Sequence, residues 1–397
     1  MLFSEVIQPI SCLVTDNLNL LIPVTIVFYS SYYFLSVVHK PQIICRSRKF
    51  NQFIDNHLSI LKRSYWPTPW LVNHHQQTVL RILLQRNPHF NYYREEFITD
   101  DGGLIYLDWS EDPNNEEYTT KDKPTVLILP GLTGDSHVNY IKQLVHLTNL
   151  QGYRAVVFNN RGLGGAQLQT PRTFCPPFSK DVELVVNHVK LRCSNAPLIA
   201  AGVSLGGIIL LNYLAKDQAS KPIVAAYVSS AGWDIAKSMD SLEQPVNQIL
   251  YNRHCTRRLQ KMFKKNEDFL LSIREQHSFN LDEVYRANSM REIDQHYKLP
   301  VFGFSDMEEY HMAGSPSKKL SNLTIPVLCI NSKDDPFSPH DAIPVNKCNA
   351  ETPLALVVTK YGGHIGFMEG LFPFGPTYSD KIFAEFISSV FKYQHEL

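Results

Sequence analysis

The chain has 397 residues with 38 basic and 38 acidic side chains, so no net charge draws it toward nucleic acid. Its composition, 44% hydrophobic and 19% charged, is that of an ordinary globular protein long enough for one large α/β domain with extensions. The seven cysteines are scattered without C-x-x-C spacing, which indicates neither a disulfide framework nor a zinc site. We expect no nucleic-acid partner and no metal centre.

An apolar segment lies near the N-terminus. No charged residue lies between Asp16 and His39, and the stretch 17–38 is long enough to cross about 30 Å of hydrocarbon as a helix. A cleaved signal peptide fits less well, because no basic region precedes the run. A buried helix and a membrane-surface segment remain open alternatives. We predict that residues 1–40 form a tail and a transmembrane signal-anchor, which makes this a single-pass protein of an endomembrane such as the endoplasmic reticulum.

The rest of the chain is predicted to fold as a mostly parallel, doubly wound α/β sheet. Residues 41–90 have the pattern of an N-terminal extension with helical pieces, and residues 96–109 that of a β-hairpin. From residue 91 onward, short apolar runs alternate with helical segments, as in a sheet covered on both faces. The predicted strands are 125–129, 154–158, 197–200, 223–228, 326–330 and 354–358, and the predicted helices are 179–193, 205–217 and 379–393.

One connection is too long for an ordinary loop. Residues 234–322 separate two predicted strands and contain basic, aromatic and helical sequence. We predict that this insertion is a helical cap over the site, within a domain spanning residues 91–397. A surface excursion without function is the alternative.

Ser204 has the sequence context of an activated nucleophile. It lies in a G-x-S-x-G motif between the apolar run 197–200 and the predicted helix 205–217. A strand-to-helix turn lifts such a serine out of the sheet on strained backbone, and the flanking Gly202 and Gly206 leave room for it. The helix then directs its N-terminal amides at the place where an oxyanion would form. This context predicts a nucleophile elbow, against the simpler reading of a glycine-rich turn.

A histidine and a carboxylate follow in the order that an α/β-hydrolase fold requires. His364 lies in a glycine-rich turn after the strand 354–358, and Asp334 and Asp335 follow the strand 326–330. The spacing alone does not choose between the two aspartates. We favour Asp335, because Pro336 would stiffen the loop at the residue that orients the histidine.

Two backbone amides are candidates for an oxyanion hole. One is the amide of Leu205, directly after the nucleophile, and the other is that of Leu132, in the loop after the strand 125–129. A second glycine-rich stretch, Asn160–Gly165, lacks G-x-G-x-x-G spacing, so we predict no dinucleotide site and assign Arg161 to a loop or core anchor. The predicted chemistry needs neither a metal nor an organic cofactor.

Nine short motifs are spread along the chain: Pro69-Trp70, Asn73–Thr78, Asp101-Gly102, Leu107–Trp109, Pro130–Gly134, Asn160–Gly162, Ala201–Gly207, Asp334–Pro336 and Gly362–His364. Together they resemble the membrane-anchored α/β-hydrolase-domain family, sometimes called the fourth AB-hydrolase family. The resemblance runs from about residue 65 to the C-terminus and is closest to the phospholipase type. It implies that the second aspartate, Asp335, serves in the triad, and that the substrates are glycerophospholipids such as phosphatidylcholines.

The sequence therefore predicts a membrane-bound serine hydrolase acting on lipid esters, and the resemblance implies an A1-type phospholipase. A monoacylglycerol lipase or carboxylesterase would use the same residues, and a non-catalytic lipid-binding module on a hydrolase fold is a further alternative. The expected partners are the lipid substrate and the bilayer, with no obligate protein partner implied. The side of the membrane is ambiguous. Four basic residues between 40 and 49 follow the anchor and favour a cytosolic hydrolase domain, whereas the family resemblance implies the opposite side.

Overall fold

The computed structural model describes residues 21–85, 88, 91–111, 121–216 and 222–397. Within them, nine strands form one sheet in the order β1-β9-β8-β7-β6-β4-β5-β3-β2. The six strands from β9 to β5 in that order are parallel, and β1, β3 and β2 are antiparallel to their neighbours. This confirms the mostly parallel α/β sheet. The strands are β1 (Gln42–Cys45), β2 (Tyr93–Ile98), β3 (Leu104–Ser110), β4 (Thr125–Leu129), β5 (Arg154–Asn159), β6 (Leu198–Val203), β7 (Ala225–Ser229), β8 (Val327–Ser332) and β9 (Leu354–Thr359).

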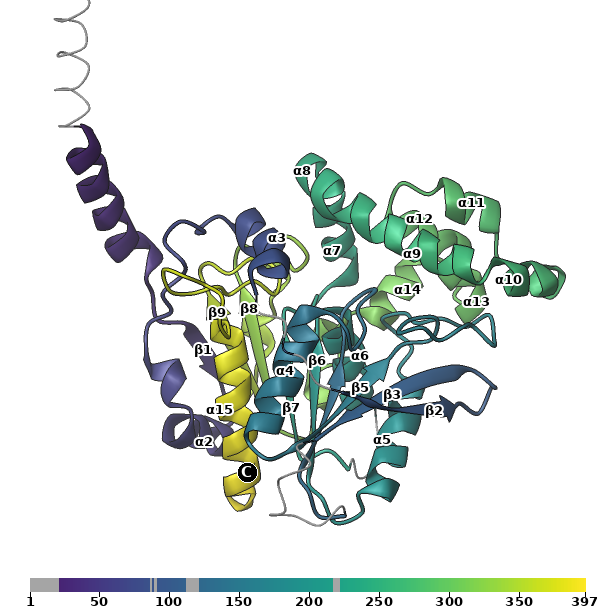
Figure 1. Cartoon of the computed structure of the whole chain (residues 1–397), viewed down its shortest axis with the longest axis horizontal. Helices are drawn as coiled ribbons and strands as arrows, with labels where there is room; N and C mark the ends of the chain where they lie inside the picture. The colour runs from purple at the N-terminus through teal and green to yellow at the C-terminus, as the bar shows by residue number, and fades with distance from the viewer. Residues whose placement is uncertain (1–20, 86–87, 89–90, 112–120, 217–221) are drawn as a thin grey trace, which may run out of the picture.

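Helices cover both faces of the sheet, which explains the continuous apolar runs of its strands (Figure 1). All five residues of β4 are buried. Val126 and Ile128 pack into a core shared with α2 (Arg48–His57), α4 (Asn139–Leu150) and α15 (Tyr378–Tyr393). Leu127 and Leu129, which alternate with them, pack into the opposite core with α5 (Lys180–Arg192) and α6 (Leu205–Leu214). Successive side chains of β4 therefore point to opposite faces of the sheet and pack into two different cores.

The helix after the elbow lies in the interior. Every residue of α6 is buried, which fits a sequence that is apolar on all sides. The predicted helix 205–217 ends earlier, at Leu214, and its last predicted residue lies outside the described part of the chain.

The segment 41–90 contributes to the sheet itself. We expected an extension with helical pieces, but β1 pairs with β9, with Gln42 opposite Val358. The strand β1 escaped prediction because it has only four residues and shows no clear alternation of burial. Farther along, α3 (His74–Leu84) contains the predicted helical piece at residues 82–84.

The long insertion is helical. Between β7 and β8 lie α7 (Ile235–Leu242), α8 (Pro245–Asn247), α9 (Arg253–Lys265), α10 (Glu267–Ile273), α11 (Leu281–Arg286), α12 (Met290–Ile293), α13 (Leu299–Phe302) and α14 (Met307–Gly314). Figure 1 shows these green helices gathered beside α6 at one end of the sheet. Their apolar residues, such as Leu259 and Phe263, join the core that contains α5 and α6, so the insertion packs onto the domain as one body.

A helix projects from the body at the N-terminal end of the described chain (Figure 1). Residues 21–32 are α-helical and Tyr33–Val37 continue as a π-helical turn. The apolar side chains of this helix are largely exposed, Leu35 by 79%, whereas Tyr33 and Val37 are buried at its base. Among the residues described, no helix combines the length and the apolar character needed to cross a membrane. Residues 17–20 of the predicted span lie outside them.

Candidate active site

Ser204 occupies a sharp turn between β6 and α6. Its backbone angles are φ 53° and ψ −120°, a conformation that non-glycine residues rarely adopt and that signals a strained, functional position. Its amide donates to the carbonyl of Ser229 at 2.8 Å, which ties the turn to β7. A Cβ at Gly206 would overlap the carbonyl oxygens of Leu129 and Pro130, so α6 can approach β4 only because this position is glycine.

We expect Gly206→Ala to destabilise the protein by roughly 3 kcal/mol, because fixed backbone atoms must move to admit the methyl group. Chemical denaturation measures the change. Gly375→Ala is the matched control, since a Cβ there meets nothing within 4 Å. Equal unfolding midpoints for the two variants would contradict this account of the elbow.

The structure brings Ser204, His364 and Asp335 into one hydrogen-bonded chain. His364 Nε2 lies 2.9 Å from Ser204 Oγ, and His364 Nδ1 lies 2.9 Å from Asp335 Oδ2. The Asp335 side chain is fully buried, and its Oδ1 also accepts from the amides of Phe337 and Ser338. A carboxylate facing Nδ1 fixes the proton on that nitrogen, which leaves Nε2 free to accept from the serine hydroxyl.

His364 is held in place by groups from distant parts of the chain. Its amide donates to Thr78 Oγ1 of α3 at 2.9 Å, and the ring of Phe337 stacks on its imidazole at 4.0 Å between centroids. The next amide, of Ile365, donates to Ser230 Oγ at 3.0 Å. Sequence reasoning assigned no role to Thr78. The only signal for it was the Asn73–Thr78 motif within the family resemblance.

Asp334 points to a different group from its neighbour. Its Oδ1 accepts from the amide of Gly363 at 2.9 Å, and burial raises the pKa of its carboxyl to about 6. It therefore braces the turn that carries His364, while Asp335 faces the imidazole. The geometry separates the two aspartates that spacing left undecided.

The two predicted oxyanion donors lie beside Ser204. Leu132 and Leu205 line the same cavity as the serine, and a Cβ built on Gly131 would come within 3.1 Å of Ser204 Cβ. In the described part of the chain, neither the Leu132 amide nor the Leu205 amide donates to a backbone carbonyl. Thr133, with φ 56°, sits in the tight turn that follows Leu132. Both amides are thus available to an oxygen near Ser204.

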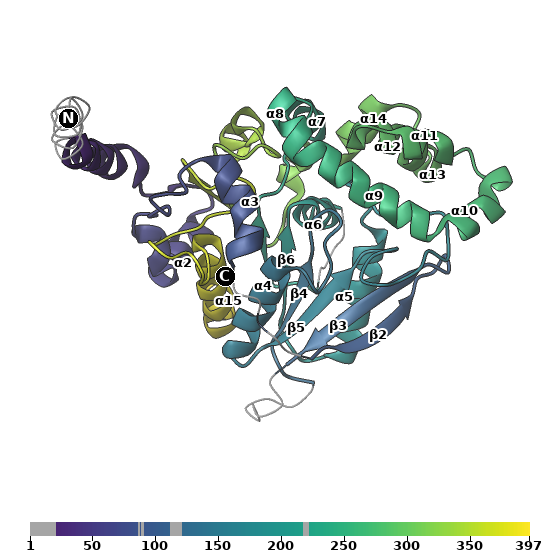
Figure 2. The same cartoon turned by 45° about the horizontal axis from the view of Figure 1, so that its top comes forward.

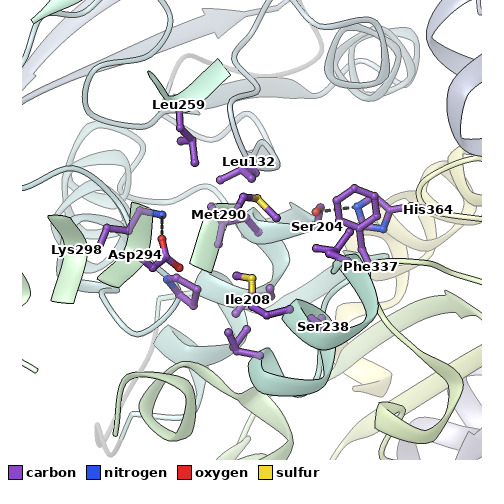
Figure 3. A pocket seen from close by; sticks show the side chains of 16 residues that line it. Leu132, Ser204, Ile208, Ser238, Leu259, Met290, Asp294, Lys298, Phe337 and His364 are labelled. Atoms are coloured by element: carbon purple, nitrogen blue, oxygen red, sulfur yellow. Dashed lines mark hydrogen bonds and ion pairs between the residues drawn. The ribbon is translucent and has the colours of Figure 1, made fainter. Parts of the chain in front are cut away.

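The cavity next to Ser204 is mostly apolar. Its empty space is about 620 Å³ when the part open to solvent is included, and the insertion supplies much of its wall. Figure 3 shows Ser204 and His364 at one side of it and a charged pair, Asp294 and Lys298, at the other. Lys298 Nζ lies 2.9 Å from Asp294 Oδ1, and both side chains are buried. The apolar lining residues are Leu132, Leu205, Ile208, Ile235, Met239, Leu242, Leu259, Met290 and Phe337.

Arg161 lies away from this cavity and has a structural role, as expected. It is 2% exposed, and its guanidinium binds the carboxylates of Asp101 and Asp181 at 2.6–2.9 Å. This network ties the β2–β3 turn to the start of α5. As for metals, the described residues contain no group of three or more His, Cys, Asp or Glu side chains placed to hold an ion.

Comparison with known proteins gives concordant similarities. Residues 124–371 match the model of the family described as alpha/beta hydrolase fold. The chain is 41% identical over 372 residues to the mouse protein named Phospholipase ABHD3, covering 94% of this chain and 89% of that protein. It is 27% identical over 364 residues to the zebrafish protein named Monoacylglycerol lipase ABHD2, covering 89% and 86%. Among solved structures, an esterase from Pyrococcus furiosus resembles it with a TM-score of 0.48 and 14% identity, over 78% of this chain and 97% of that one.

Proposed function

Because this chain belongs to the α/β-hydrolase family, we propose that it is a serine hydrolase of lipid esters, acting as an A1-type phospholipase on phosphatidylcholines. The observation that carries the proposal is the hydrogen-bonded chain from Ser204 through His364 to Asp335, opening on an apolar cavity. The mouse relative named as a phospholipase supports the substrate class.

In the proposed reaction, Ser204 is the nucleophile and His364 the general base. His364 Nε2 takes the hydroxyl proton as Ser204 Oγ attacks the ester carbonyl, and Asp335 stabilises the imidazolium that forms. His364 then returns the proton to the leaving alcohol. A water molecule, activated by the same imidazole, hydrolyses the acyl-enzyme.

The negative charge of the tetrahedral intermediate falls on the former carbonyl oxygen. We assign its stabilisation to the amides of Leu132 and Leu205, aided by the N-terminal end of α6. These donors are fixed by the backbone before the substrate arrives, so they need no reorganisation during the reaction. This chemistry uses no metal and no organic cofactor.

The wall of the cavity supports an acyl chain as the group bound beside the serine. Methylene groups lose contact with water against side chains such as Ile208, Leu259 and Met290, at about 0.8 kcal/mol each. A monoacylglycerol lipase would use the same wall, and the zebrafish relative of that name makes it the second candidate.

Lipid analysis tests the proposal and separates the two candidates. Membranes are incubated with the protein or with Ser204→Ala, and the products are identified by mass spectrometry. We expect 2-acyl lysophosphatidylcholine and free fatty acid to appear with the wild type alone. Turnover of monoacylglycerol without turnover of phosphatidylcholine would instead favour the lipase. Labelling of wild type but not of Ser204→Ala by a fluorophosphonate would report an activated serine whatever the substrate.

We further propose that the N-terminal apolar segment anchors the protein in an endomembrane such as the endoplasmic reticulum. The exposed apolar side chains of residues 21–35 support this, together with the absence of charge between Asp16 and His39. Tethering would raise the local concentration of a substrate that resides in the bilayer.

For the side of the membrane, we predict a cytosolic hydrolase domain. Lys40, Arg46, Arg48 and Lys49 follow the anchor, and no lysine or arginine precedes it. External protease added to sealed microsomes should therefore digest the domain without detergent. A domain that survives until detergent is added would lie in the lumen, where Asn322, in the chain's single N-x-S/T sequence, could carry a glycan.

A further inference from the structure

The helix α3 has one side against the active site and the other in solvent. On the inner side, Thr78 holds the amide of His364. On the outer side, Val79, Ile82 and Leu83 are exposed, Leu83 by 71%. Three large apolar side chains on one exposed helix face are a feature of surfaces that bind a partner.

A second helix likewise has one side against the active-site cavity and apolar side chains exposed on the other. Residues 245–265 are helical without interruption through α8, a π-helical turn and α9, and are called here the 245–265 helix. Its inner side carries Leu259, which lines the cavity beside Ser204. Its first turns expose Val246, Ile249 and Leu250, Ile249 by 66%.

The remainder of the 245–265 helix carries a row of cations. Arg253, Arg257, Lys261 and Lys265 recur every fourth residue, so they follow one another along its exposed side. Among the described residues, no carboxylate lies within ion-pair distance of any of the four. Two members of the row and the neighbouring Arg258 affect the pKa of a nearby histidine. The pKa of His254 is lowered chiefly by burial and then by Arg258, Lys261 and Arg257.

The two helices form one surface. His75 Nδ1 of α3 lies 2.8 Å from the hydroxyl of Tyr251 in the 245–265 helix, which ties them together. Figure 2 shows α3, α8 and α9 along the side that comes forward, with the N-terminal helix at one end of it. Beside the N-terminal helix, Trp66 is exposed, and its ring lies 6.0 Å from the ring of Phe34.

We propose that α3 and the 245–265 helix dock on the surface of a bilayer that contains anionic lipids. The exposed apolar side chains enter the interface, and the cation row binds lipid phosphates and carboxylates. Charge complementarity selects this occupant, because an unpaired cationic row beside large apolar groups matches an anionic headgroup layer over hydrocarbon. The exposed Trp66 on the same side suits the headgroup level.

Docking has a direct consequence for catalysis. Both helices contact the active site from their inner sides, so binding at their outer sides holds the cavity against the membrane. This inference rests on the proposed lipid substrate, but binding is measurable without turnover. The tests are therefore made in the Ser204→Ala background, where lipids stay intact.

The experiment uses the full chain reconstituted in bilayers of phosphatidylcholine, with or without phosphatidylserine, whose acyl chains carry bromine. Because the chain already contains four tryptophans, the quenching is measured as the increase over the Ser204→Ala parent, and in Ile249→Trp this increase reports insertion of the first turns. Leu191→Trp is the matched control, since Leu191 is an 83% exposed leucine at the end of α5. We expect quenching of the indole at position 249 in bilayers with phosphatidylserine, reversed by salt, and none at position 191.

A charge variant isolates the row. Arg253, Arg257, Lys261 and Lys265 are changed together to Gln, leaving Arg258, which contacts Thr133. We expect the docked fraction on anionic bilayers to fall at least about threefold, because each cation at such a surface strengthens binding roughly fivefold. The control changes four exposed lysines elsewhere, Lys62, Lys121, Lys318 and Lys392, to Gln and should leave docking unchanged.

Two results would overturn the proposal. One is an indole at position 249 that stays water-exposed on both bilayers, which would leave a protein partner as the occupant. The other is an equal loss of docking in the row variant and in the four-lysine control, which would mean that docking depends on the net charge of the protein and not on the position of the row. If the protein docks as expected but the wild type hydrolyses neither phosphatidylcholine nor monoacylglycerol, the proposed function is wrong and the proposed docking surface is still supported.

Discussion

Ser204→Ala is expected to lower kcat by about 10⁴-fold or more while the protein stays folded. The loss corresponds to about 5 kcal/mol of transition-state stabilisation, because among the described residues that line the cavity only the hydroxyl of Ser204 is paired with a general base. The substitution removes only an oxygen whose partner is His364 Nε2, at 2.9 Å. The measurement is ester hydrolysis by purified protein, with circular dichroism to establish the fold.

Ser238→Ala is the matched control for that loss. Ser238 lines the same cavity, and its buried hydroxyl has no hydrogen-bond partner among the described residues. Its removal should leave kcat within a few-fold of wild type. A folded Ser204→Ala protein that hydrolyses the ester near the wild-type rate would exclude the proposed mechanism.

The strands and helices around the elbow could be predicted because their sequence patterns directly reflect how they are buried in the fold. The run 125–129 is continuously apolar since both of its faces are covered, and it forms β4 at those same residues. Ser204 and His364 stand out because chain order and flanking glycines restrict the choice. The choice of Asp335 rests on the neighbouring Pro336 and partly on the family resemblance, and in the structure it is Asp335 that faces the imidazole.

The supporting residues could not be predicted from local pattern. Thr78 reaches His364 across 286 positions of sequence, and a threonine inside a helix carries no signal of such a contact. The pairing of β1 with β9 is equally distant in sequence. The net charge of zero also gave no sign of the cation row that begins at Arg253. A net charge is summed over the whole chain, whereas the row lies on one side of one helix. These features depend on which segments meet, and only the folded chain determines that.

The adjacent aspartates provide the most discriminating test of the site. Asp335→Asn is expected to lower kcat by about 10⁴-fold, because an amide facing His364 Nδ1 favours the tautomer that cannot accept the serine proton. Asp334→Asn should cost far less, since its neighbour Gly363 can still donate to an amide oxygen. The reverse order of losses would move the triad acid to Asp334 without changing the nucleophile.

The dependence of stability on pH tests the environment of Asp334 independently of catalysis. Burial raises the pKa of Asp334 to about 6, above the ordinary value of 3.8, so its ionised form is disfavoured in the folded protein. Its contribution to stability is therefore full below about pH 3.8 and is lost as the pH rises through about 6. Asp334→Asn removes this titration. In denaturation at a series of pH values from about 3 to about 8, a window that spans both pKa values, wild type should lose stability relative to Asp334→Asn as the pH rises. Parallel curves for the two proteins would mean that folding does not raise the pKa of Asp334.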